Sequence, residues 1–322
     1  MLPPMSTLKN LVSEIDRASE LRTSQSELDA QWAKAKIIHI VDARLAVQGS
    51  ELNLLDSAEV SALVSSEKFL TGERYFLGLD RADGTAYFAW HTAWTNESGS
   101  DEEKYSGFET LRELGFSLSS KFLSLAFHAI GLANWHEVHP RCSRCGAPTV
   151  VGLGGSVRIC TVDESQHHPR TDSAVIVLVH DRDDRILLGH NPLWPERRFS
   201  NFAGFLEPGE TFEQCVAREV LEECGITVDE MSYMTSQPWP FPASIMIAFS
   251  AVTNKPHEAK ADGVEITEVR WFSRDEMKDA IKTGELLLPP SISVARRMIE
   301  SWYGAQSGRD LSDLVGGESW RP

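Results

Sequence analysis

The alternation of apolar and polar residues predicts an N-terminal region in which helices and strands are mixed. Short runs rich in β-branched and aromatic residues, bounded by turn residues, are typical of paired strands, whereas apolar residues at intervals of three and four indicate helices. The predicted elements are a helix over residues 5–22, strand pairs over 37–41 with 44–47 and over 75–79 with 86–90, and an apolar helix over 118–135.

From residue 171 onward the pattern changes to strand, strand, loop, helix, strands and helix, which is compatible with a mixed sheet held between helices. The predicted strands cover residues 173–180, 186–189, 244–250 and 269–272, and the last helix covers 291–302. Ser273 and Glu276 have the spacing of a capping box that begins a further helix. We therefore predict an α+β protein with four parts: an N-terminal domain (1–139), a small linker segment (140–170), a second domain (171–303) and a loose C-terminal tail (304–322).

The composition is that of a folded protein long enough for two domains. Of the 322 residues, 42% are hydrophobic, which is ordinary for a globular chain. The formal net charge of −16 argues against a broad nucleic-acid surface, because such surfaces are rich in Lys and Arg. The sequence has no apolar run long enough to span a membrane, and its first five residues lack the pattern of a signal peptide. We expect no membrane contact and a cytoplasmic location.

Three glutamates, Glu219, Glu222 and Glu223, stand at positions i, i+3 and i+4 and therefore share one face of a predicted helix. Thr211 can cap the start of this helix, and Gly225 stands where a helix commonly ends. Like charges this close destabilise a helix unless they bind a cation, and carboxylate clusters suit Mg²⁺ or Mn²⁺ better than Zn²⁺. The alternative interpretation is an acidic helix face that is simply exposed to solvent.

The full spacing around these glutamates resembles the Nudix signature. Its fixed positions are filled by Gly204, Glu210, Arg218, Glu219, Val220, Glu222, Glu223, Gly225 and Ile226. The resemblance implies the Nudix fold, a mixed-sheet α/β/α sandwich, and hydrolysis of a nucleoside diphosphate linked to another moiety. It also implies that Arg218 orients the glutamates through ion pairs and does not touch the substrate.

Residues 236–244 combine three alternating prolines with Trp239 and Phe241. Because proline cannot donate to a central strand ladder, we expect a rigid extended loop or sheet edge that presents aromatic faces for stacking, or else a stiffened segment without a ligand. The stretch resembles the SQPWPFPxS element of NADH pyrophosphatases of the NudC type. The resemblance implies that substrate is contacted by Gln237, Pro238, Trp239, Pro240, Phe241, Pro242, Ala243 and Ser244.

The NudC-type resemblance assigns roles outside these two motifs as well. It implies that Glu265 is a metal ligand, with Glu268 as the alternative, and that the backbone of Ala295 contacts substrate. We expect Phe205 to flank the nicotinamide or the base. The family commonly has a stacking tyrosine at the position of His168, whose flat ring either makes the same contact or lies on the surface without a role.

The implied reaction is metal-assisted attack of water on the P–O–P bridge of the substrate. Glu223 is the favoured base or water-orienting group, and Glu222 is the alternative. The Mg²⁺ or Mn²⁺ ligands are then expected to be Glu219, Glu223 and Glu265, with a contribution from Glu222.

The chain contains five cysteines, an odd number that does not suggest a disulfide framework. Cys142 and Cys145 form a zinc-knuckle turn, and Cys160 stands where the second half of a four-ligand ribbon begins. In the family that half reads Cys-x-x-Cys, and Asp163 replaces its last cysteine here. We expect either a structural zinc site of the three cysteines with Asp163 or His167, or a ribbon that folds without metal.

The NudC-type resemblance implies hydrolysis of NADH or NAD to nicotinamide mononucleotide and AMP, and it also implies removal of an NAD cap from the 5′ end of RNA. One alternative is a Nudix hydrolase for ADP-ribose or another nucleoside-diphosphate derivative. The other is a non-catalytic nucleotide sensor, which the retained glutamates disfavour. The resemblance further implies a homodimer whose substrate site draws on both subunits.

Overall fold

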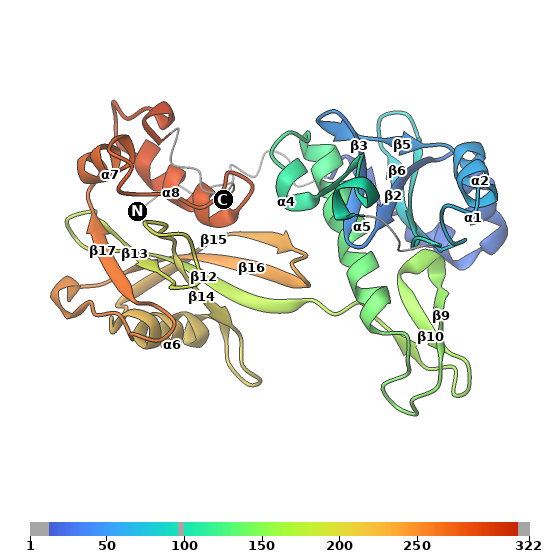
Figure 1. Ribbon diagram of the computed structural model, residues 1–322. Helices are drawn as coiled ribbons and strands as arrows, with labels where there is room; N and C mark the ends of the chain where they lie inside the picture. Colours follow the sequence, from blue (N-terminus) through green and yellow to red (C-terminus); the bar gives the residue numbers. More distant parts are fainter. Residues whose placement is uncertain (1–12, 96–99, 315–322) are drawn as a thin grey trace. The chain divides into compact units, whose positions relative to one another are not determined.

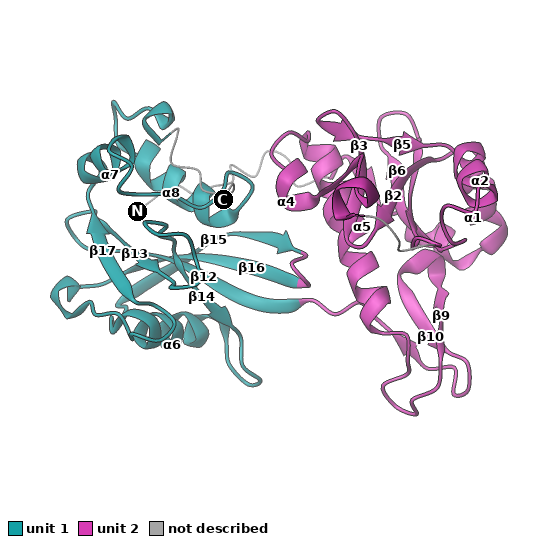
Figure 2. Ribbon diagram, viewed as in Figure 1, with its two compact units in different colours: residues 1–9, 172–239, 244–322 teal, residues 10–171, 240–243 magenta. Residues whose placement is uncertain are grey.

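The computed structural model describes residues 13–95 and 100–314, and it divides into two compact units (Figures 1 and 2). Among the described residues, unit 1 contains 172–239 and 244–314, and unit 2 contains 13–171 together with 240–243. The segment 140–170 thus lies within unit 2. The four-part division stays a prediction.

Unit 2 is built on an eight-stranded sheet in the order β1-β6-β7-β2-β3-β4, with β5 paired to β2 and β8 paired to β3. Its strands are β1 (Ile15–Asp16), β2 (Lys36–Val41), β3 (Arg44–Gln48), β4 (Glu51–Leu52), β5 (Leu54–Leu55), β6 (Glu73–Asp80), β7 (Ala86–His91) and β8 (Phe108–Thr110). Its helices are η1 (Ser19–Thr23), α1 (Gln25–Trp32), α2 (Ser57–Ser65), α3 (Asp101–Lys104), α4 (Leu111–Leu114) and α5 (Ser120–Val138). Both predicted strand pairs are confirmed, because β2 with β3 and β6 with β7 are antiparallel neighbours.

Helices cover both faces of this sheet. On one face, α5 buries Leu125 and Ile130 in a cluster that also contains Ile38 and Leu77 of the sheet. On the other face, α1 and α2 pack on side chains such as Phe76. The apolar helix predicted over 118–135 is therefore confirmed as α5.

The predicted helix over residues 5–22 is wrong at residues 15–16, which form a strand, whereas residues 19–22 belong to the short 3-10 helix η1 and residues 5–12 lie outside the described residues. Ile15 and Asp16 form strand β1, which pairs with Leu79 and Asp80 at the edge of β6. Ile15 is buried in the α5 cluster. Pairing with a distant strand satisfies the backbone and buries an apolar side chain at once, and this outweighs a weak local helical pattern.

A three-stranded antiparallel sheet completes unit 2. It has the order β11-β10-β9 and follows α5 along the chain. The elements are β9 (Thr149–Gly152), η2 (Leu153–Gly155), β10 (Val157–Cys160) and β11 (Gln166–His167).

Unit 1 contains a six-stranded sheet in the order β15-β16-β12-β13-β17, with β14 paired to β12. Its strands are β12 (Asp172–His180), β13 (Ile186–His190), β14 (Phe202–Phe205), β15 (Glu230–Trp239), β16 (Ser244–Val252) and β17 (Glu268–Phe272). Its helices are α6 (Phe212–Cys224), η3 (Pro256–Glu258), α7 (Arg274–Lys282), α8 (Val294–Gly304) and η4 (Leu311–Leu314). The sheet is mixed, because β12 and β16 are parallel whereas the other pairs are antiparallel.

Helix α6 lies on one side of this sheet and helices α7 and α8 lie on the other (Figure 1). The middle of the central strand β12, residues 174–179, is apolar because alternate side chains enter different cores. Val175 and Val177 join the α6 core, and Ile176 and Leu178 join the α7–α8 core. The predicted α/β/α sandwich is confirmed.

Two predictions about the margins of unit 1 have different outcomes. Strand β15, which carries Pro238, is the outer strand of the sheet, as expected for a proline-rich edge. Most residues of the predicted loose tail from 304 to 312 are exposed, but Leu314 is fully buried and its carbonyl accepts a hydrogen bond from Arg296 Nη2 at 2.9 Å, so the loose tail stays a prediction. Residues 315–322 lie outside the described residues.

Candidate active site

Helix α6 carries the three glutamates of the predicted metal site, and its ends form as the sequence indicates. Thr211 is the N-cap and makes a capping box with Gln214, and Gly225 ends the helix in the left-handed conformation with φ 69°. The apolar face buries Val216 and Val220 completely against the sheet. This burial fixes the rotation of the helix and so determines where its acidic side chains point.

Glu223 is the buried member of the acidic group, with only 5% of its surface exposed. Its Oε2 accepts a hydrogen bond from the backbone N–H of Ala203 at 3.1 Å. Burial, reinforced by the nearby charges of Glu265 and Glu219, raises the pKa of Glu223 to about 8. The chain thus holds a carboxylate where its ionised form is disfavoured unless a cation is present.

Glu219 packs directly against the backbone of β14 at Gly204. A Cβ atom at position 204 would lie 1.9–2.2 Å from the carboxyl atoms of Glu219, which is far inside van der Waals contact. The missing Cβ at position 204 therefore leaves the space that the Glu219 carboxyl occupies, and the backbone angle at this glycine is not an unusual one. Burial raises the pKa of Glu219 as well, and the charges of Glu222 and Glu265 act in the same direction.

Arg218 links the acids of the box through a set of ion pairs, as predicted. Its Nε and Nη2 bind the two oxygens of Glu210 at 2.6 and 2.9 Å. Its Nη1 lies 2.7 Å from Glu219 Oε1 and 3.1 Å from Glu222 Oε2. Hydrogen bonding to Arg218 lowers the pKa of Glu210 to about 2. Nη2 also donates to the carbonyl of Phe205 at 3.0 Å, which ties the helix to the end of β14.

Glu265 comes from a turn before β17, far from α6 in sequence. The carboxylate of Asp262 shapes this turn by accepting hydrogen bonds from the backbone N–H groups of Glu265 at 3.0 Å and Ile266 at 2.7 Å. The charge of Glu265 acts on both Glu219 and Glu223 and contributes to the raised pKa of each. Sequence reasoning missed Asp262, although an Asp-Gly pair is a turn signal that could have indicated it.

The predicted substrate residues of β15 and α8 meet at one buried side chain, Gln237. Its Nε2 donates to the carbonyl of Ile292 at 2.7 Å, and its Oε1 accepts from the N–H of Val294 at 2.6 Å. Both ends of the amide are thus used to hold the start of α8, where Ala295 lies. Phe205 is exposed at the end of β14. Trp239 and Ser244 end β15 and begin β16, and Pro240, Phe241, Pro242 and Ala243 form the turn between them.

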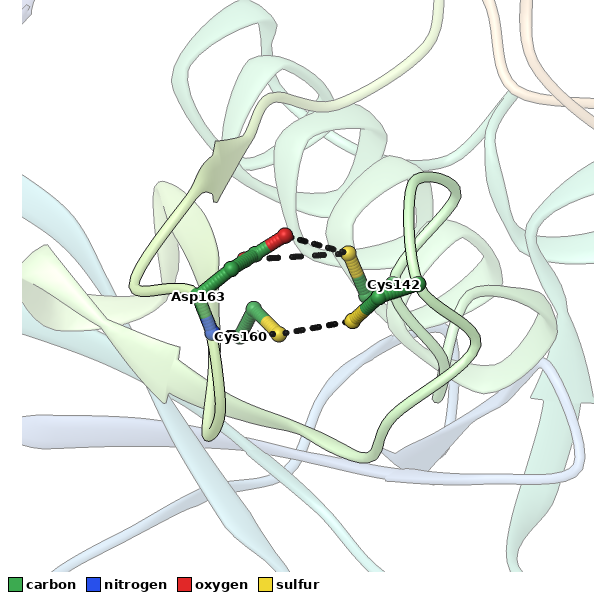
Figure 3. A group of neighbouring side chains, drawn as sticks. Cys142, Cys160 and Asp163 are labelled. Carbon is green, nitrogen blue, oxygen red and sulfur yellow. Dashed lines mark hydrogen bonds between the residues drawn. The ribbon is translucent and has the colours of Figure 1, made fainter.

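A second cluster lies in unit 2 and is formed by Cys142 and Cys145 before β9, by Cys160 at the end of β10, and by Asp163 in the turn that follows (Figure 3). The Sγ atoms of Cys145 and Cys160 are 3.5 Å apart, and Cys142 Sγ lies 3.8 and 3.9 Å from the Asp163 carboxylate oxygens. All four ligand atoms lie within 4.8 Å of one another. A Zn–S bond of about 2.3 Å would place two sulfurs of a tetrahedral site about 3.8 Å apart. The spacing therefore fits a metal ion such as zinc.

Two histidines follow this cluster. His167 Nε2 lies 3.3 Å from Cys142 Sγ and 3.2 Å from Ser165 Oγ, beside the four-atom group and not within it. His168 is exposed in unit 2. Its stacking role stays a prediction.

The sandwich with a glutamate-bearing helix defines the class of protein. Residues 170–289 match the family model described as NUDIX domain. That range contains the whole box, the Asp262–Glu265 turn and the proline-rich hairpin. No helix within the described ranges combines the length and the apolar character that a membrane crossing requires.

Similarity to curated proteins extends well beyond that domain. The NAD-capped RNA hydrolase NudC of Mycobacterium bovis is 38% identical over 299 residues, which cover 90% of this chain and 93% of the relative. The mitochondrial NAD(P)H pyrophosphatase NUDT13 of Mus musculus is 35% identical over 229 residues, which cover 67% of this chain and 65% of the relative. The chain belongs to the NudC-type family of Nudix hydrolases.

Proposed function

We propose that the protein hydrolyses the pyrophosphate bond of NADH or NAD to give nicotinamide mononucleotide and AMP. The observation that carries the proposal is the convergence of Glu219, Glu223 and Glu265, in which burial, reinforced by repulsion between the carboxylates, raises the pKa of the two helical carboxyls. The substrate is supported by relatives named as an NAD-capped RNA hydrolase and an NAD(P)H pyrophosphatase. We extend the proposal to removal of an NAD cap from RNA, since the same bond is broken.

The donor set fits Mg²⁺ or Mn²⁺, because it consists of carboxylate oxygens only and has an excess of negative charge. Glu219, Glu223 and Glu265 would hold the ion, and Glu222 would contribute. When bound, a divalent ion neutralises charge on the pyrophosphate and acidifies a water molecule.

Glu223 is the group that we assign to take the proton from the attacking water or to orient it. One of its oxygens is held by the Ala203 N–H, which leaves the other for this task. Glu222 is the weaker candidate, because its side chain is 60% exposed and is bound to Arg218. Arg218 keeps Glu219 and Glu222 oriented and remains paired with Glu210.

The substrate would lie over the end of β14, with Phe205 beside the nicotinamide or the base. Gln237 fixes the start of α8, so that the backbone of Ala295 can meet the substrate. We include the Pro238–Ser244 stretch and His168 among the substrate contacts, and we propose a homodimer that shares its substrate site. A cytoplasmic location is part of the same proposal.

For the cysteine cluster, we propose a structural zinc ion held by Cys142, Cys145, Cys160 and Asp163. The sulfur spacing supports this assignment. Asp163 is already oriented by the N–H and hydroxyl of Ser165, at 3.0 and 2.6 Å. A site closed by four protein ligands stabilises a fold and leaves no position for substrate.

The test is a direct comparison of NADH, NAD, NAD-capped RNA and ADP-ribose at equal concentration, with Mg²⁺ or Mn²⁺. We expect nicotinamide mononucleotide from the first three, in its reduced form from NADH, and the highest kcat/KM for a nicotinamide substrate. Faster turnover of ADP-ribose would overturn the substrate assignment. Binding of all four without turnover of any would instead indicate a nucleotide sensor.

A further inference from the structure

The turn between β15 and β16 is built into a different unit from its own strands. We call Pro240, Phe241, Pro242 and Ala243 the hairpin tip. These four residues belong to unit 2, whereas the strands on either side belong to unit 1 (Figure 2). The contacts of the hairpin tip within unit 2 are therefore part of what determines its shape.

Asn134 of α5 supplies hydrogen bonds that the hairpin tip cannot make for itself. Pro240 and Pro242 have no N–H groups, so the usual bonds across a tight turn are lost at both positions. The Nδ2 of Asn134 donates to the carbonyl of Pro240 and to the carbonyl of Pro242, each at 3.1 Å. Because these carbonyls lie on either side of Phe241, one side chain fixes the backbone that presents this ring.

Two further contacts hold the hairpin tip. The guanidinium carbon of Arg112 lies 4.5 Å from the centroid of the Phe241 ring, at a distance typical of a cation–π contact, and Phe241 also packs against the α5 core. Gly131, one turn before Asn134 on α5, faces Pro240. A Cβ at position 131 would lie 3.8 Å from Pro240 Cβ, so a methyl group fits and a longer side chain would collide.

We propose that Asn134 positions the hairpin tip for substrate binding, assisted by Arg112 and Gly131. None of the three is assigned to contact substrate. They act through the hairpin tip, which sets the geometry of the adjoining Trp239 and Ser244. The inference rests on the proposed function. It gives unit 2, which contains Asn134, Arg112 and Gly131, a role in substrate recognition.

Asn134→Asp is the sharpest test, because it keeps the shape of the side chain while replacing two donors with acceptors next to two carbonyls. Asn254→Asp is the matched control, at an exposed position beyond the far end of β16, where the acceptor for Arg182 is retained. Gly131→Leu tests the same contact by steric displacement, with Gly131→Ala as its control. All four variants are measured as full-length proteins after their thermal unfolding has been compared with the wild type.

Two measurements distinguish the contact between Asn134 and the hairpin tip from its effect on substrate binding. Hydrogen exchange of the peptide that contains the Phe241 and Ala243 amides reports on the hairpin tip without reference to any substrate. Steady-state kinetics with NADH report on positioning. We expect N134D and G131L to exchange faster and to raise KM about tenfold, with kcat less affected and the Mg²⁺ concentration for half-maximal activity unchanged. N254D and G131A should behave as the wild type does.

If hydrogen exchange of the hairpin-tip peptide were unchanged in both N134D and G131L, the proposal that α5 holds the hairpin tip would be overturned. Faster exchange with unaltered KM would overturn the positioning role. If the wild type does not hydrolyse NADH at all, the proposed function fails and the positioning role fails with it, while hydrogen exchange still decides the contact.

Discussion

The protein gathers acidic or thiol side chains in two places that differ in how their ligands are supplied. The glutamate cluster, Glu219, Glu222, Glu223 and Glu265, takes three members from one helix and contains oxygen donors only. The cysteine cluster, Cys142, Cys145, Cys160 and Asp163, takes its ligands from two turns and is mainly sulfur. Oxygen clusters of this kind leave coordination positions for water and substrate, whereas four protein ligands close a tetrahedral site. On the proposed function, we expect the glutamate cluster to be the reactive centre and the cysteine cluster to be structural.

The largest effect is expected for Glu223→Gln, which tests whether the glutamate cluster is the reactive centre. The amide can still accept from the Ala203 N–H, but it cannot act as a base and is a poor metal ligand. We expect kcat with NADH to fall by roughly 10³-fold or more while the protein stays folded. The measurement is steady-state kinetics with thermal unfolding in parallel. Full activity in the folded variant would contradict the role assigned to Glu223.

Gly204→Ala tests the close approach that only the tertiary structure reveals. The new methyl group would overlap the carboxyl of Glu219, and the flexible end of that side chain would have to move. We therefore expect kcat/KM to fall by about 10²-fold, as for a misplaced catalytic group, with little loss of thermal stability. A large loss of stability at normal activity in the surviving folded protein would show that the glycine serves the fold and not the site.

The metal-free protein should lose stability as the pH rises, relative to the E223Q variant. The folded-state pKa of Glu223 is about 8, against an ordinary value of 4.5. The folded state therefore binds this proton more tightly, and the stabilisation is complete below pH 4.5 and lost as the pH approaches 8. We expect the difference in unfolding free energy between wild type and E223Q to change by about 4 kcal/mol over this range.

Chemical denaturation at several pH values in the presence of a chelator measures this difference. Added Mg²⁺ should remove most of it, because the cation replaces the proton. A flat difference from pH 5 to pH 8 would contradict the raised pKa.

For the cysteine cluster, the matched pair is Asp163→Cys and Asp163→Ala. Cysteine would complete a four-sulfur site and alanine would leave three ligands. We expect zinc affinity to rise about tenfold in the first and to fall about tenfold in the second. Competition with a chromogenic chelator measures both. Equal affinities in all three proteins would remove Asp163 from the ligand set and favour His167.

The smallest effect is expected for Glu222→Gln, which distinguishes the role of Glu222 from that of Glu223 within the glutamate cluster. The Glu222 side chain is largely exposed and touches Arg218 at 3.1 Å. Exposed ion pairs contribute little, so kcat/KM should fall only a few-fold. A loss as large as that of E223Q would exchange the roles of the two glutamates.

The sequence determined the features that depend on local spacing. The i, i+3, i+4 glutamates, the Thr211 cap and the Gly225 ending all follow from the period of one helix, and Pro238 favours a sheet edge for β15. Local pattern failed at residues 15–16, where pairing with β6 replaced the predicted helix.

Contacts between residues that lie far apart in the sequence could be known only from the three-dimensional structure. It placed Gly204 under Glu219, brought the Asp262 turn and its Glu265 to Glu223, and set the hairpin tip on Asn134. These contacts join segments whose separation along the chain carries no periodic signal. The raised pKa of Glu223 has the same origin, since it arises from burial and from a charge more than 40 residues away in sequence. Spacing along the chain indicated the ligands, and the packing of the sheet and its helices decided their charge state and their geometry.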